Sequence, residues 1–215
     1  MGLFERMRVA SRLVVAGIVV FLGLALIVAY SVWHVQTEAL AAHDARLKDL
    51  VEVARGMVGN YQKLAGEQKL APEEAQKHAA EALRALRFAK DDYFFVYDFD
   101  GRAVMVAGNP KIEGQVMLGK TDAAGFKLWD AFVAIGKAGS GYVDYVFPRA
   151  GQTVPKPKRA YLFGVPEWKW IVGTGVYVDD VDEAVKQGAL SYGLMSLLVL
   201  VVVAAVALLV SRSIV

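Results

Sequence analysis

Residues 92–107 read DYFFVYDFDGRAVMVA, an aromatic and β-branched run followed by turn residues and a second apolar run. The residue types at 93–97 are those that strands favour. The tetrapeptide DFDG at 98–101 has the composition of a tight turn. This stretch therefore predicts a β-hairpin whose second strand covers 102–107.

Three further strand patterns follow the hairpin, at 141–147, 158–165 and 168–178, with glycine- and proline-rich turns around them. Between the hairpin and these strands, an apolar pattern at 124–138 predicts one inserted helix. Because consecutive hairpins pair antiparallel, the sequence predicts an antiparallel sheet of about five strands.

Two helices are expected upstream of the hairpin. Apolar or small residues repeat every seven positions at Leu40, Leu47, Ala54 and Tyr61, which predicts a long helix from residue 34 to about 68. Pro72 suits the first turn of a second helix that ends near Phe88. The expected fold is therefore α+β, with one face of the sheet packed on the long first helix.

Uncharged apolar runs lie near both ends of the chain, at residues 13–33 and 189–210. A helix needs about 20 apolar residues to cross the hydrocarbon core of a bilayer, so both runs are long enough. The alternative for the first run is a signal peptide, whose apolar region is usually shorter, about 7–15 residues. We therefore predict two transmembrane helices.

Basic residues predict the orientation in the membrane. Outside residues 34–188 the chain has four arginines and one acid, a net charge of +3, whereas the middle segment has 20 basic and 21 acidic residues. Because positive flanks stay in the cytoplasm, segments 1–12 and 211–215 are predicted to be cytoplasmic and the domain at 34–188 extracytoplasmic. The balanced charge of that domain argues against a nucleic-acid partner.

No catalytic or metal-binding constellation is visible in the sequence. The chain has no cysteine, which excludes disulfides and thiolate metal sites. The three histidines lie on predicted helices and are not spaced as a metal pair. A membrane-tethered enzyme would need a nucleophile–base pair or a metal cluster, so we expect no enzymatic activity, no metal and no cofactor.

Lys158 and Arg159 are the most informative polar residues, because they open a predicted strand within an aromatic setting. A cation beside a partly dry pocket would hold a small anion by charge-assisted hydrogen bonds. The alternative is that both are solvated charges protecting a strand edge. The aromatic residues alternate along three predicted strands and form either core or pocket wall: Phe95, Tyr97, Tyr145, Phe147 and Tyr161.

Four segments together resemble the single Cache domain, type two, of bacterial chemoreceptors (methyl-accepting chemotaxis proteins). They are DYFFVYDFDG at 92–101, LGKTD at 118–122, GSGYVDYVFP at 139–148 and PKPKRAYLFGVPEWKWIVGTGVYVDDVD at 155–182. The tail SRSIV at 211–215 resembles the start of a HAMP linker.

The resemblance implies a PAS-like sheet behind a long helix, a homodimer, and a periplasmic sensor domain in a multi-pass protein of the bacterial inner membrane. It also implies a pocket for a small carboxylate such as acetate, propionate, pyruvate or lactate. Lys158 and Tyr161 fall in the family's Pro-Lys-x-x-Tyr segment. Tyr145 and Phe147 stand where the family often has Tyr-x-Trp, and Asp122 matches the aspartate before the inserted helix.

The chain departs from this pattern at two places. It has Asn109-Pro110 where many relatives have His-Pro, which removes a pocket histidine. Phe147 in place of tryptophan also removes an indole donor.

In the predicted mechanism Lys158 neutralises the acid, while Tyr145 and Tyr161 donate hydrogen bonds to it. The apolar wall is predicted to consist of Phe95, Tyr97, Met105 and Trp129. Signals would reach cytoplasmic partners through a region after Val215, which could be a chemoreceptor module, a histidine kinase or a cyclic-dinucleotide enzyme. A scaffolding role, with the aromatic face as core, is the remaining alternative.

Overall fold

The computed structural model describes residues 9–89 and 92–213. The chain divides into two units, one of residues 41–180 and the other formed by the two ends of the chain, up to residue 40 and from residue 181 on. Helix α1 (Val9–Gly66) contributes to both units. The unit of residues 41–180 contains the whole sheet.

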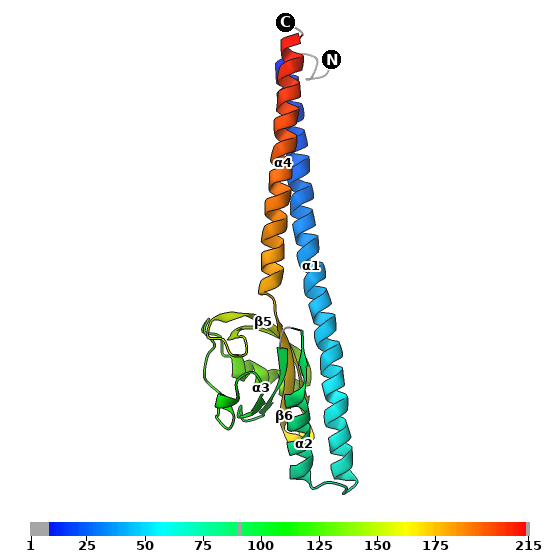
Figure 1. The fold of residues 1–215 in the computed structure, drawn as a ribbon, viewed down its shortest axis with the longest axis vertical. Helices are drawn as coiled ribbons and strands as arrows, with labels where there is room; N and C mark the ends of the chain where they lie inside the picture. The colour runs from blue at the N-terminus through cyan, green and yellow to red at the C-terminus, as the bar shows by residue number, and fades with distance from the viewer. Residues whose placement is uncertain (1–8, 90–91, 214–215) are drawn as a thin grey trace. The chain divides into compact units, whose positions relative to one another are not determined.

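Six antiparallel strands form this sheet in the order β1-β2-β6-β5-β4, with β3 also paired to β2 (Figure 1). The strands are β1 (Arg87–Phe88), β2 (Asp92–Asp98), β3 (Ala103–Val106), β4 (Ser140–Pro148), β5 (Pro155–Val165) and β6 (Trp170–Tyr177). Short 3-10 helices, η2 (Pro110–Ile112) and η3 (Pro166–Trp168), lie in the connections. The predicted hairpin and the antiparallel pairing are confirmed.

The sixth strand lies where a helix was expected. Helix α2 (Pro72–Ala85) begins at the predicted proline but ends three residues before Phe88. Leu86 is extended, with φ −74° and ψ 129°, and the two residues after it pair with β2 as strand β1. The pairing with the next strand along the chain supplies hydrogen bonds that a further helical turn would otherwise provide.

Helix α3 (Leu128–Ala138) also begins later than the predicted start at residue 124. The side chain of Asp122 accepts hydrogen bonds from the backbone N–H groups of Ala124 and Phe126, both at 2.9 Å. Aspartate competes in this way with the backbone carbonyls of a helix. Residues 122–126 consequently form a turn.

Helices cover both faces of the sheet. On one face, Val51, Ala54 and Val58 of α1 pack with α2 and with side chains such as Phe163. On the other face lies α3 (Figure 1). Its side chains pack against those of β2, β4 and β5 that point the opposite way. The long first helix therefore lies against the sheet as predicted.

Glycine allows α3 to approach the sheet closely. A Cβ added at Gly164 of β5 would collide with the carbonyl oxygen of Gly136 in α3. Gly173 of β6 is similarly crowded by the side chains of Leu162 and Phe95. The Gly-Thr-Gly run at 173–175 thus serves close packing.

The other unit consists of the first part of α1 and helix α4 (Asp179–Ser213). In α1, a stretch starting at Gly17 is long and apolar enough to cross a membrane, with a mean hydropathy of 2.3. In α4 the apolar stretch found among the described residues is Leu190–Ala205, which is shorter than a membrane span requires. One candidate span is therefore established, and the crossing by α4 stays a prediction.

Candidate ligand-binding site

Lys158 is buried in the middle of an aromatic cage. It lies on β5 opposite Tyr145 of β4 and Tyr177 of β6, and the residue is 1% exposed. Its Nζ lies 4.1 Å from the ring centre of Tyr93 and 4.6 Å from that of Tyr177. Within the part of the chain that the structure describes, Nζ has no hydrogen-bond partner. The predicted alternative of a solvated strand-edge lysine is therefore wrong.

Burial lowers the pKa of Lys158 from 10.5 to about 7, with Asp92 opposing this change and Arg149 adding to it. Desolvation disfavours the charged form of an amine, and the faces of the two tyrosine rings compensate only in part. An anion placed against Nζ would add to the effect of Asp92 and raise the pKa again. The site is thus electrostatically prepared for a negative ligand.

A cavity lies beside this lysine on the α3 side of the sheet. Its lining is mostly aromatic and includes Tyr93, which connects it to Nζ of Lys158; the lining residues are Tyr93, Phe95, Tyr97, Val106, Leu128, Phe132, Tyr145 and Phe147. The cavity volume is about 10 Å³, close to the room that one water molecule needs. The site is therefore nearly closed in this conformation.

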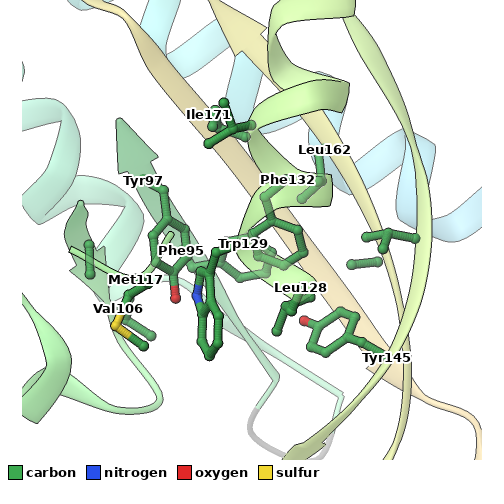
Figure 2. Packing of buried hydrophobic residues seen from close by; sticks show 14 of the residues in the cluster. Phe95, Tyr97, Val106, Met117, Leu128, Trp129, Phe132, Tyr145, Leu162 and Ile171 are labelled. Atoms are coloured by element: carbon green, nitrogen blue, oxygen red, sulfur yellow. The ribbon is translucent and has the colours of Figure 1, made fainter. Parts of the chain in front are cut away.

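Aromatic packing keeps the cavity small. The rings of Phe95 and Phe132 are stacked with centres 5.2 Å apart, and Tyr145 meets Phe132 edge-on at 5.6 Å. Figure 2 shows these side chains converging from two strands and α3. A ligand larger than water would have to separate these rings.

The polar groups around the cavity are hydrogen-bond donors. Burial raises the pKa of Tyr93, Tyr97 and Tyr145, so their hydroxyls keep their protons. The indole Nε1 of Trp129 is buried beside the Tyr97 hydroxyl (Figure 2), and this N–H opposes part of the rise in the pKa of Tyr97. Lysine and tryptophan can only donate, so the surroundings suit a ligand that accepts, such as a carboxylate.

The structure brings together most of the predicted site residues. Four of them line the cavity, and Lys158 adjoins it through Tyr93: the four are Phe95, Tyr97, Tyr145 and Phe147. Trp129 is also buried in the same apolar cluster, at 5% exposure. Strand alternation explains this grouping, because residues two apart on β2 and on β4 share a face.

Two predicted residues lie on the α1 and α2 side of the sheet and not at the cavity. Tyr161 is three positions from Lys158 on the same strand and therefore points to the opposite face; its hydroxyl donates to Oγ of Ser140 at 3.0 Å. Met105 pairs with Val96 and packs in the cluster on the α1 and α2 side. The prediction that Tyr161 donates to the ligand and that Met105 forms its wall is corrected accordingly.

Asp122 has a structural position. Besides the two turn bonds, its Oδ2 accepts a hydrogen bond from the backbone N–H of Val146 at 2.9 Å. It thereby ties the loop before α3 to β4, next to Tyr145. Asp122 therefore holds the frame of the cavity and does not line it.

Several residues around the site were missed by sequence reasoning: Tyr93, Tyr177, Val106, Leu128 and Phe132. Tyr93 could have been found, because it lies two positions before Phe95 and so shares its face. Tyr177 becomes a neighbour of Lys158 only through the pairing register of β5 and β6.

A larger groove adjoins the closed cavity. It has a volume of about 370 Å³ and lies between residues 108–111 and 147–153, including the cationic side chains of Lys111 and Arg149. Phe147 belongs to both linings. The side chain of Phe147 therefore lies between the groove and the cavity.

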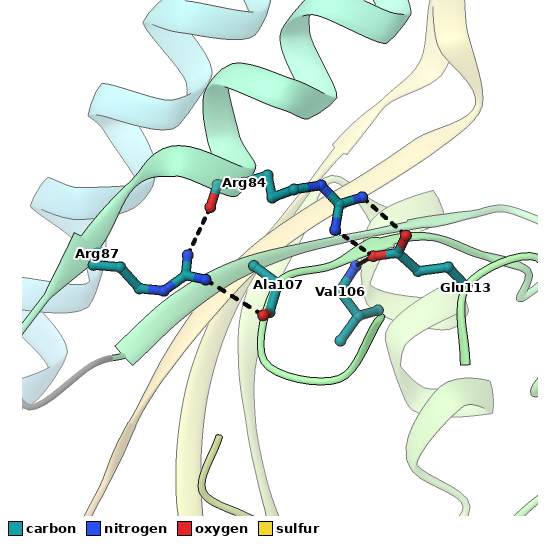
Figure 3. Close-up of polar contacts among 5 residues, drawn as sticks. All are labelled: Arg84, Arg87, Val106, Ala107 and Glu113. Atoms are coloured by element: carbon teal, nitrogen blue, oxygen red, sulfur yellow. Dashed lines mark hydrogen bonds and ion pairs between the residues drawn. The ribbon is translucent and has the colours of Figure 1, made fainter. Parts of the chain in front are cut away.

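The loop that forms one side of this groove is tied to α2. Arg84 of α2 donates two hydrogen bonds to the carboxylate of Glu113, at 2.8 and 2.9 Å, and Glu113 also accepts the backbone N–H of Val106 (Figure 3). Burial acts to raise the pKa of Glu113, but these hydrogen bonds outweigh it and lower the pKa. Arg87 donates to the carbonyls of Arg84 and Ala107 (Figure 3).

Comparison with known proteins adds independent information. A family model described as single Cache domain 2 matches residues 40–190. A methyl-accepting chemotaxis protein, McpP of Pseudomonas putida, is 33% identical over 80% of this chain and 32% of its own length. The sensor histidine kinase MctS of Rhizobium johnstonii is 32% identical over 66% of this chain and 30% of its own. The chain thus spans about a third of the length of these relatives.

Two solved structures are similar to the sheet-containing part. The periplasmic sensor domain of a chemotaxis protein has 41% sequence identity and a TM-score of 0.63, covering 65% of this chain and 97% of its own. A Cache chemosensory domain described for carboxylic acid recognition has 33% identity and the same TM-score, covering 66% and 97%.

Proposed function

Since the chain belongs to the single Cache domain 2 family, we propose that residues 34–188 bind a small carboxylic acid outside the cytoplasm and that the chain is the sensor region of a transmembrane receptor. Family membership confirms the resemblance seen in the sequence and identifies a sensor domain. The ligand, the membrane topology and the output are the parts that we propose.

The observation that carries the ligand assignment is the buried Nζ of Lys158, which has no hydrogen-bond partner among the described residues. A core without ligand would gain stability from an apolar side chain at this position, because an uncompensated buried charge is costly. This argues against the scaffolding alternative. A carboxylate would form a charge-assisted hydrogen bond with Nζ, and the tyrosine hydroxyls beside it would orient the remaining oxygen.

The proposed ligands are acids of two or three carbons, such as acetate, propionate, pyruvate or lactate, which is the ligand class that the family resemblance implies. A volume of about 10 Å³ does not hold even these ligands, so binding requires the Phe147 ring and the loop at residues 107–115 to move. The adjoining groove of about 370 Å³ offers the route. The similar structure described for carboxylic acid recognition supports this ligand class.

We propose that the receptor spans the bacterial inner membrane twice, with segments 13–33 and 189–210 in the bilayer and the sensor domain in the periplasm. Segments 1–12 and 211–215 would then be cytoplasmic, as the positive flanks favour. Residues 1–8 and 214–215 lie outside the described residues. We also propose a homodimer, since the long helix α1 offers a surface on which a second copy can pack.

The output is proposed to be chemotaxis through a cytoplasmic module that follows this region. The relative McpP is a methyl-accepting chemotaxis protein, which favours this output. The alternative is a histidine kinase, which the relative MctS favours. The sequence that follows Val215 in the genome decides between them, because a long heptad-repeat helix is expected for a chemoreceptor and a catalytic domain for a kinase.

Calorimetry on the whole 215-residue chain in detergent micelles tests the ligand assignment. Acetate, propionate, pyruvate and lactate are titrated into the wild type and into Lys158→Met, and we expect at least one acid to bind the wild type alone. Lys156→Met is the matched control, because Lys156 lies two residues away and its ammonium is 3.5 Å from Asp179. Absence of binding by all four acids, or equal binding by Lys158→Met, would refute the proposal.

A further inference from the structure

Lys158 and Arg159 are neighbours on β5 that serve opposite faces of the sheet, since side chains alternate along a strand. Lys158 points to the cavity side, against the ring of Tyr93. Arg159 points to helix α1, where its Nε and Nη2 donate to the two carboxylate oxygens of Asp44 at 2.6 and 3.0 Å. Lys158 is therefore connected to α1 through one peptide unit and the ion pair between Arg159 and Asp44.

The contact between Arg159 and α1 is reinforced from β4. Nη1 of Arg159 donates to Asp144 at 2.7 Å, and the guanidinium lies 4.9 Å from the ring centre of Tyr142. The hydroxyl of Tyr142 in turn donates to the backbone carbonyl of Asp44 at 2.9 Å. Asp44 is thus held through both its side chain and its main chain.

The polar contacts at Asp44 are directional, unlike the apolar packing further along α1. Val51, Ala54 and Val58 contact the sheet through methyl groups in a non-directional way. Such a surface permits the helix displacements of about 1–2 Å that occur in conformational switches. A bidentate arginine–carboxylate pair has a defined geometry, so the contact at Asp44 favours one register of α1 against β5.

We propose that Arg159 is a positioning residue that ties the place of Lys158 to the register of helix α1 through its ion pair with Asp44. Because the peptide unit between Lys158 and Arg159 is planar and stiff, a shift of the strand at Lys158 displaces the Arg159 guanidinium. Events in the cavity and the placement of α1 then form one coupled equilibrium. The inference rests on the proposed function for the nature of the ligand, but its test needs no ligand.

Amide hydrogen exchange of the whole chain in detergent micelles tests the coupling. Exchange of residues 41–51 of α1 is measured in the wild type, Lys158→Met, Asp44→Asn and the double variant. We expect Lys158→Met to change these rates by about fivefold or more when Asp44 is present. In the Asp44→Asn background the same substitution should change them by less than about twofold.

Two further variants make the test specific. Glu52→Gln removes the ion pair with Arg55, 3.2 Å long and also on α1, and should leave the effect of Lys158→Met intact. Arg159→Lys keeps a cation but cannot form the bidentate pair, so it should reduce the effect even if Asp44→Asn does not fold.

Two results would overturn the coupling. One is that Lys158→Met leaves the amide exchange rates of α1 unchanged. The other is that Lys158→Met changes these rates just as much when the Asp44–Arg159 pair is absent. Neither result depends on acid binding. If the exchange effect is found and calorimetry detects no acid, the coupling stands and the ligand proposal fails.

Discussion

Replacing Lys158 by methionine should stabilise the domain, although it removes a residue at the centre of the proposed site. The pKa of Lys158 falls from 10.5 to about 7 on burial. Each tenfold change in proton affinity corresponds to about 1.4 kcal/mol, so burial disfavours the ammonium by about 5 kcal/mol. The two tyrosine rings offset part of this, and we expect a net stabilisation of roughly 1–4 kcal/mol in Lys158→Met.

The stability difference between Lys158→Met and the wild type should depend on pH in a defined direction. Below pH 7 the folded and unfolded states both carry the proton, so the wild type bears the full cost of the buried charge. Between pH 7 and about 10.4 the folded domain has released a proton that the unfolded chain still binds, and the stability of the wild type therefore rises with pH. The advantage of Lys158→Met should be largest near pH 6 and shrink as the pH increases.

Urea unfolding of the whole chain in micelles, followed by tryptophan fluorescence between pH 6 and 9.5, measures this difference. The control is again Lys156→Met. The partly exposed ion pair between Lys156 and Asp179 should contribute less than about 1 kcal/mol at any pH. The reasoning is refuted if Lys158→Met is less stable than the wild type at pH 6. It is equally refuted if the difference between the two proteins does not change with pH.

Two other substitutions test the frame of the site. Glu113→Gln removes the charge-assisted pair with Arg84 and should cost about 1–3 kcal/mol, measured as faster hydrogen exchange or proteolysis in the loop at residues 107–115; unchanged protection there would contradict the role given to this pair. Gly164→Ala places a methyl group against the carbonyl of Gly136 and should lower the free energy of unfolding by about 1–3 kcal/mol. Gly59→Ala in α1, where a Cβ meets nothing, is its control, and equal thermal stability of the two variants would argue against the close α3 contact.

Local sequence patterns predicted much of the sensor domain. The hairpin at residues 92–107, the strand around Lys158 and the long first helix all follow from residue types and their spacing, and the structure confirms them. The errors occur where a strand-pairing or side-chain hydrogen bond replaces a helical one. Strand β1 takes the end of the predicted second helix, and Asp122 delays the start of α3.

The site was predicted only in part, for a related reason. Alternation along one strand suffices to group Phe95 with Tyr97, and Tyr145 with Phe147. Applied strictly, it would also have separated Tyr161 from Lys158, which are three positions apart. The family pattern Pro-Lys-x-x-Tyr led to the prediction that Lys158 and Tyr161 share one pocket, whereas the strand geometry puts them on opposite faces of the sheet.

Composition and periodicity were enough to predict apolar segments at both ends of the chain and an α+β domain between them, because apolar runs, turns and alternation are local properties. The tertiary structure alone decided that Tyr93 and Tyr177 enclose Lys158 and that Asp44 holds Arg159. These contacts depend on strand register and on the placement of a helix about a hundred residues away in the chain. Such distant pairings arise from the packing of the whole domain and leave no mark in the local sequence.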